Sequence, residues 1–236
     1  MNFRNHIVMC LLALLIMAGC ASTKVTNRDE LVTGKLTRPG NIWVYDFAAT
    51  PADVPAESAL AGQHSKHNPP QTAKEIAMGR ELGAEIEAQL VKQIRAMGMP
   101  AEHAVAGTTP QINDLVIRGY LVSFNAGSAA KRILIGFGSG ASDLKVAVEG
   151  FQMTARGLRK LGSGSTDAEG GKTPGADLGV LGLLATHNPA GLIISSGMKI
   201  YGQESGSSTV KGRAKQTAKE IADVLKKRFQ EQGWIS

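Results

Sequence analysis

Cysteine is nearly absent from this sequence. Its 236 residues include two cysteines, Cys10 and Cys20, and Cys10 lies in an apolar leader that we expect to be removed. A chain that retains Cys20 alone cannot form an intramolecular disulfide bond, because that bond needs two cysteines. Folds held together by internal disulfides are therefore excluded.

Aromatic residues are also scarce, at 5% of the chain. They do not alternate with lysine and arginine, whereas a surface that stacks nucleic-acid bases needs rings beside basic side chains. The net charge is only +6, and the basic residues are spread along the sequence. This composition argues against nucleic-acid binding and allows at most a non-specific attraction to anionic envelope surfaces.

Motifs of nucleophilic catalysis and of phosphate binding are missing or incomplete. The chain has no G-x-S-x-G nucleophile elbow. Residues 136–141 have the G-x-G-x-x-A spacing of a dinucleotide-binding turn, but a strand pattern follows where that motif needs a helix, and residues 155–165 lack the acidic residue that would bind ribose. Pro174 blocks the helix that a phosphate loop ending at Thr173 would need. We therefore predict that the chain is not an enzyme; the alternative is a nucleotide-binding or hydrolytic envelope enzyme that uses the Gly136–Gly140 loop.

The histidines form no recognisable metal-binding motif. His64 and His67 are three residues apart in a proline-rich stretch, and His103 and His187 lie elsewhere. A zinc site needs a further ligand at a recognisable spacing. We predict that no histidine binds a metal or takes part in catalysis, and we expect no cofactor.

The carboxylate of Asp46 stands out because it follows a dense apolar stretch at the end of an expected strand. We expect this carboxylate to cap the strand or to pair with Arg118 or Arg132. Both roles are more common for such a residue than acid–base chemistry.

The first 19 residues have the pattern of a targeting segment. Residues 7–17 are apolar but too few for the ~20 that a membrane-spanning helix needs, and small residues lead into Cys20. This pattern resembles a bacterial lipoprotein signal, which implies cleavage after residue 19 and acyl chains such as palmitate on Cys20; the alternative is an ordinary secretory signal with a chance cysteine. Ala21, where aspartate would favour the inner membrane, implies the outer membrane. Residues 20–39 are polar and predict a flexible tether.

A single α/β domain of the α+β type is predicted over residues 40–236. Dense or alternating apolar residues predict strands, and apolar residues at helical spacing between a capping residue and a glycine predict helices. Two main amphipathic helices would pack on a small mixed β-sheet of about three to four strands. The expected strands are 41–47, 112–124 and 143–153, and the expected helices begin at Thr72 and Val210 and end before Gly98 and Gly233.

Several local features refine this prediction. Residues 157–182, rich in glycine and serine, predict a long flexible excursion, and a short helix is expected from residue 189. The apolar positions of the third strand change from even to odd across Gly150, which predicts a β-bulge. The heptapeptide QTAKEIA occurs at 71–77 and at 216–222, as two similar helices packed on one sheet would explain.

Glycines at alternate positions mark the stretch that precedes the third strand. Glycine has no side chain, so such positions allow a sharp turn or the close approach of another backbone. We predict a structural or interaction motif here, which serves either packing within the domain or contact with a partner or a second copy. Its residues are Arg132, Gly136, Phe137, Gly138, Gly140 and Ser142.

These elements together carry a resemblance. The segments 41–47, 114–124, 132–142 and 233–235 are similar to those of uncharacterised bacterial lipoproteins grouped as domain of unknown function 4410. The resemblance spans the predicted domain and implies its fold and an envelope setting, but no activity. The order of elements is also similar to that of curli-secretion lipoproteins and of lipoprotein activators of peptidoglycan synthases.

The combined expectation is a non-enzymatic lipoprotein, anchored to the outer membrane through Cys20, that presents a periplasmic α/β interaction domain. Its expected partners are the membrane and either an unidentified envelope protein or further copies of itself. The alternative of a different class is a self-assembling secretion-channel or envelope-assembly subunit.

Overall fold

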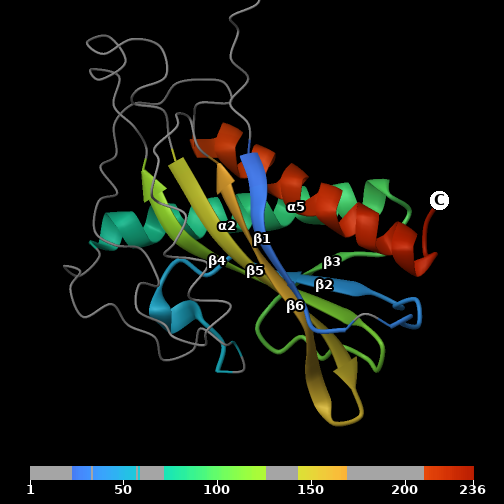
Figure 1. Ribbon diagram of the computed structural model, residues 1–236. Coiled ribbons are helices and arrows are strands. Elements are labelled where there is room, and N and C mark those ends of the chain that lie inside the picture. The colour runs from blue at the N-terminus through green and yellow to red at the C-terminus, as the bar shows by residue number, and fades with distance from the viewer. Residues whose placement is uncertain (1–22, 33, 57, 59–71, 126–142, 169–209) are drawn as a thin grey trace, which may run out of the picture.

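The computed structural model places six β-strands in one sheet and two long α-helices within the part of the chain that it describes (Figure 1). That part comprises residues 23–32, 34–56, 58, 72–125, 143–168 and 210–236. In chain order the elements are β1 (Thr23–Glu30), β2 (Ile42–Tyr45), the short 3-10 helix η2 (Pro51–Asp53), α2 (Ala73–Ala96), β3 (Glu102–Ala104), β4 (Leu115–Asn125), β5 (Asp143–Thr154), β6 (Gly157–Ala168) and α5 (Val210–Gln232).

The sheet is mixed, with the strand order β1-β6-β5-β4-β2-β3. The first four strands in this order pair antiparallel with one another, whereas β2 is parallel to both β4 and β3. The chain passes from β2 to β3 through α2, since adjacent parallel strands need such a crossover. The predicted fold class is confirmed, with more strands in the sheet than the predicted three to four.

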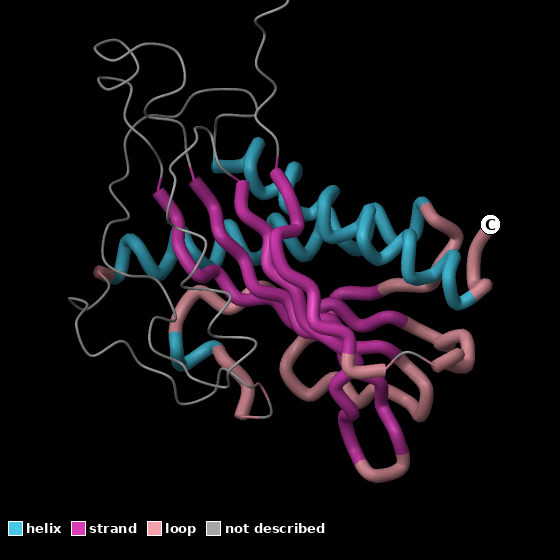
Figure 2. The backbone as a smooth tube through the Cα atoms, viewed as in Figure 1, coloured by secondary structure: helices cyan, strands magenta, loops and turns pink. Residues whose placement is uncertain are grey.

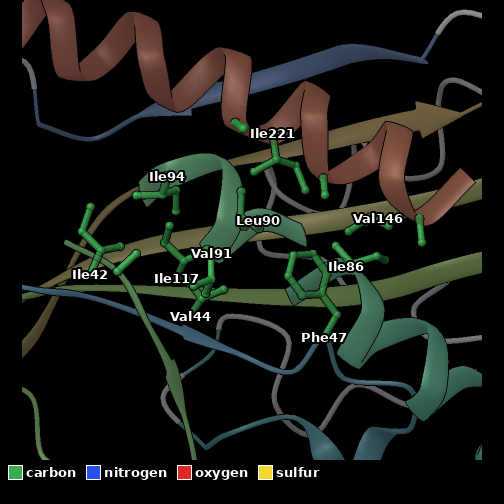
Figure 3. Close-up of a cluster of buried hydrophobic side chains, with 14 of the residues drawn as sticks. Ile42, Val44, Phe47, Ile86, Leu90, Val91, Ile94, Ile117, Val146 and Ile221 are labelled. Carbon is green, nitrogen blue, oxygen red and sulfur yellow. The ribbon is translucent and has the colours of Figure 1, made fainter. Parts of the chain in front are cut away.

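The two helices pack against each other and against the sheet (Figure 2). Their apolar stripes, with Leu90 on α2 and Ile221 on α5, face strand residues such as Ile117 and Val146 in one buried cluster (Figure 3). Phe47 lies at the centre of the contact between α2 and β4, because Gly83 and Gly119 leave room for it. This core follows from the helical spacing seen in the sequence.

Both helices end as predicted, at a glycine. Gly98 and Gly233 have φ angles of 82° and 75°, in the left-handed region that glycine adopts without strain. The amide of the next residue reaches back to a carbonyl in the last turn, with Trp234 N donating to Phe229 O at 2.8 Å. This is the Schellman arrangement, and the rings of Phe229 and Trp234, tilted by 37° with centroids 5.6 Å apart, supply the apolar contact that accompanies it.

The prediction of a flexible tether over residues 20–39 is wrong for its central part. Thr23–Glu30 is strand β1, paired antiparallel with β6. The segment that follows is attached to the end of α5, where Leu36 N donates to Gln232 Oε1 at 2.7 Å. An edge strand is held by backbone hydrogen bonds on one side and commonly carries polar residues, so the absence of an apolar pattern did not exclude it.

The predicted excursion over residues 157–182 is also wrong for its first part, because 157–168 form strand β6. Backbone pairing with β5 on one side and β1 on the other holds this strand despite its glycines and serines. Gly157, with φ at 104°, closes the tight turn from β5. The remainder of that segment, and the short helix expected from residue 189, lie outside the described residues.

The predicted irregularity at Gly150 is present, but the extra residue is on the neighbouring strand. Gly150 pairs with Gly162, and Phe151 pairs with Lys160, so that Leu161 on β6 has no counterpart. The pairing of β5 with β4 runs without a break past Gly150. The sequence therefore located the bulge correctly and assigned it to the wrong strand.

The repeated heptapeptide has two different environments. At 71–77 its described residues lie at the exposed start of α2, where Ala73 and Ala77 are exposed. At 216–222 it lies in the middle of α5, where Thr217 and Ala218 are fully buried. Both helices do pack on one sheet, but the two copies are not equivalent positions in it.

No helix among the described residues combines the length and hydropathy that a bilayer crossing requires.

Candidate functional site

A cavity of about 180 Å³ lies between α5 and the sheet, among the described residues. For comparison, an engineered apolar cavity of about 150 Å³ binds benzene. Glycines on β6 contribute to the space because they carry no side chain. The cavity can hold a small apolar group. Its apolar walls include Leu36, Leu115, Ile117, Val148, Phe151, Leu161, Ile221, Leu225, Phe229 and Trp234.

A buried carboxylate lies on β5, at a position that faces away from Val146 and Val148 because side chains alternate along a strand. Glu149 is fully buried. Three groups donate hydrogen bonds to it: Ser58 Oγ at 2.6 Å, Tyr120 Oη at 2.8 Å and Lys160 Nζ at 2.6 Å. Ser58 belongs to the segment after η2, so this network fixes that segment across β4 onto β5.

The network determines the ionisation of its members. Burial would raise the pKa of Glu149, but the hydrogen bonds from Lys160, Ser58 and Tyr120, together with the charge of Lys160, outweigh it and hold that pKa below its usual value. Burial and the negative charge of Glu149 raise the pKa of Tyr120. Glu149 is therefore ionised and Tyr120 protonated at neutral pH, which is the state of a structural ion pair.

Arg118, 8% exposed, lies on the same face of the sheet as Glu149, which is its cross-strand partner. Its guanidinium carbon is 5.2 Å from the centroid of the Tyr45 ring and 5.7 Å from that of Phe151, within the range of cation–π attraction. The expected pairing of Asp46 with Arg118 is wrong. Asp46 lies just beyond the end of β2, and its carboxylate faces His103 on β3 rather than Arg118.

Asp46 instead lies near a histidine and a glutamate. Its Oδ1 is 3.8 Å from Nδ1 of His103 on β3, and that nitrogen is 3.2 Å from Oε2 of Glu87 on α2. One potential ligand atom from each of the three side chains lies within 4.8 Å of the other two. Asp46 and His103 are largely exposed, with side-chain fractions of 58% and 43%, whereas Glu87 is buried at 6%.

The electrostatics of this cluster are dominated by Glu87. Burial raises the pKa of Glu87, and the negative charge of Asp46 raises it further, while the charge and hydrogen bond of His103 lower it without cancelling the increase. A positive charge placed among these three side chains would therefore be favourable.

A family model described as Domain of unknown function (DUF4410) matches residues 42–179. The chain belongs to this family. The match extends from β2 to beyond β6 and omits α5, so it is shorter than the whole domain that the sequence resemblance implied. Comparison with curated proteins gives no match.

The solved structures similar to this DUF4410 member include the PelC dodecamer from Paraburkholderia phytofirmans and a single-substitution variant of it. The variant has 14% sequence identity and a TM-score of 0.36, and the alignment covers 71% of this chain and 97% of the other. For the unsubstituted protein the identity is 14% and the TM-score 0.35, and the alignment covers 70% of this chain and 93% of the other. At TM-scores below 0.5, these likenesses say nothing about function.

The interaction motif expected in this DUF4410 member, Arg132 to Ser142, lies outside the described residues, as do Cys20, His64, His67 and His187. The alternative partner of Asp46, Arg132, lies there too. The structure therefore brings together only one of the histidines considered from the sequence, His103, with one of the carboxylates, Asp46.

The sequence interpretation missed Glu149 and Glu87. A signal was present for Glu87, because it is a charged residue at a position where the surrounding apolar pattern predicts burial. Glu149 falls on the polar side of the alternation formed by Leu144, Val146 and Val148, so that pattern gave no signal for it. Glu87 stands between Ile86 and Leu90 on the apolar side of α2, and a charge at such a position needs a partner.

Proposed function

We propose that this chain is a non-enzymatic lipoprotein of the bacterial envelope, anchored to the outer membrane through Cys20. Its α/β domain would then be presented in the periplasm to other envelope components, which are another protein or further copies of the chain. The observation that supports this proposal is the position of β1. That strand begins at Thr23, three residues after Cys20, and is paired with β6 from its first residue.

The short connection from Cys20 to β1 limits how the domain can be oriented on the membrane. Three residues span at most about 10 Å when extended. Acyl chains on Cys20 would therefore hold the start of β1 close to the bilayer surface, with the edge of the sheet directly attached to the anchor.

The last residues of β4 and β6 and the first residues of β5 lie at the same end of the sheet as the start of β1. Thr23 pairs with Ala168, which also pairs with Leu144, and Asp143 pairs with Asn125. The segments 126–142 and 169–209 thus join the sheet at the end next to the anchor. Under this proposal, the sheet end that carries Asn125, Asp143 and Ala168 faces the membrane. The architectural similarity to curli-secretion lipoproteins stays a prediction.

Substitution of the anchor tests the proposal. Cys20→Ser should abolish incorporation of labelled palmitate and release the protein from the outer-membrane fraction, with an unchanged circular dichroism spectrum. Cys10→Ser is the matched control, because it replaces the cysteine of the leader and should change neither property. Equal palmitate incorporation and equal membrane association for Cys20→Ser and the wild type would contradict the proposal.

A further inference from the structure

Three side chains of the kinds that bind transition metals meet beside the end of β2. Asp46 follows that strand, His103 lies on the adjacent parallel strand β3, opposite Val44, and Glu87 comes from the helix that connects the two strands. Their ligand atoms lie within 4.8 Å of one another. The connection β2–α2–β3 is what brings together residues so far apart in the sequence.

The carboxylate of Glu87 provides a second and independent observation. Its side chain is only 6% exposed. Oε2 lies 3.2 Å from Nδ1 of His103, but Oε1 is buried and has no hydrogen-bond partner among the described residues. A buried carboxylate oxygen without a partner is costly, and a metal ion is a partner that would satisfy it. Glu149, which is fully buried, has three donors and needs no ion.

We propose that Asp46, Glu87 and His103 form a binding site for a divalent transition metal ion, with Zn²⁺ the best match. One imidazole nitrogen and two carboxylates are ligands that zinc accepts, whereas Mg²⁺ and Ca²⁺ prefer oxygen ligands alone. The two carboxylate charges balance the charge of the ion when His103 is neutral. This site differs from the sequence-based expectation that no histidine binds a metal.

The exposure of the three side chains determines what the site could do. Glu87 forms a buried floor, while Asp46 and His103 are exposed at 58% and 43%. Three protein ligands leave at least one position of a tetrahedral ion for water or for a ligand from outside. The site would therefore link the ion to solvent or to a bound partner, at the side of the sheet formed by β2 and β3.

Metal titration tests this proposal on the full chain, purified in detergent without a histidine tag. The parent protein carries His64→Gln, His67→Gln and His187→Gln, so that these histidines cannot contribute. Isothermal titration with Zn²⁺ should give one equivalent bound, and Co²⁺ should give visible d–d absorption of a low-symmetry site. Loss of a residue that only orients a ligand costs about 10–100-fold in affinity, so Asp46→Asn and His103→Ala should each cost at least that much.

Glu102→Gln is the matched control, because it removes one negative charge from the same strand at the residue before His103. This variant should bind Zn²⁺ like the parent. Circular dichroism identifies any variant that fails to fold, and His103→Cys, which replaces one zinc ligand by another, should keep one equivalent bound. Absence of Zn²⁺ binding by the parent, or equal binding by His103→Ala, Asp46→Asn and Glu102→Gln, would overturn the proposal.

Discussion

The contact between Phe47 and Gly119 gives the sharpest prediction about stability. A Cβ atom added to Gly119 would lie 2.1 Å from Cδ1 and from Cε1 of the Phe47 ring, far inside van der Waals contact. The ring is 1% exposed and cannot move outward. The backbone of Phe47 is also fixed, because α2 touches it directly. A Cβ atom added to Gly83 on that helix would lie 2.2 Å from the Phe47 carbonyl oxygen.

The expected cost of Gly119→Ala follows from two opposing effects. Overpacking a filled core costs about 1–3 kcal/mol, and a direct overlap with an immobile ring belongs at the upper end of this range. Replacing glycine by alanine within a strand recovers about 0.5–1 kcal/mol of backbone entropy. We therefore expect the free energy of unfolding to fall by about 2 kcal/mol.

Urea unfolding followed by circular dichroism measures this change. Gly150→Ala is the control, because a Cβ at Gly150 on the neighbouring strand meets no atom within 4 Å. It should cause no loss of stability and a gain of up to about 0.5–1 kcal/mol. Phe47→Leu combined with Gly119→Ala should cost less than the sum of the two single changes, since neighbours couple. Wild-type stability for Gly119→Ala, or an equal loss for Gly150→Ala, would refute the packing argument.

Two further predictions concern the buried ion pair and a helix end. The folded-state pKa of Glu149 is lowered, so its stabilisation is present above the unfolded value of about 4.3 and is lost as the pH falls through the folded-state pKa. Glu149→Gln should cost about 1–3 kcal/mol at pH 7 and reduce this acid sensitivity, and an unchanged pH profile of urea unfolding would contradict this prediction. Gly233→Ala places a side chain at a φ of 75° and should cost about 1 kcal/mol, whereas a melting temperature equal to that of the wild type would disprove the strain argument.

The sequence predicted the elements whose side chains bury one regular face. Apolar residues at helical spacing located α2 and α5, and dense apolar runs located β2, β4 and β5. Strands β1 and β6 could not be predicted in this way. They are held by backbone pairing, which leaves no apolar pattern in segments such as Thr23–Glu30.

The candidate metal cluster could not be predicted from local spacing either. Asp46, Glu87 and His103 are joined only by the parallel pairing of β2 with β3, and the three-residue strand β3 was not expected. The single local signal was Glu87, a carboxylate on the apolar side of a helix. The assignment of the bulge to β5 rather than β6 has a similar cause, because the register of a pair is not visible in one strand.

The central claim, that Cys20 attaches the start of β1 closely to the membrane, is tested most directly by measuring the orientation of the domain on a bilayer. Lys145→Cys carries a dye near the proposed membrane end of β5, and Arg156→Cys carries it in the β5–β6 turn at the opposite end of the sheet (Figure 1). Nine residue steps at ~3.3 Å each, from Lys145 to the end of β5 at Thr154, place the turn about 30 Å from the label at 145. Energy transfer from the dye to labelled lipid headgroups, in vesicles that contain the lipidated protein, should be much more efficient for the label at 145. Equal transfer from both positions, or more efficient transfer from 156, would contradict the account.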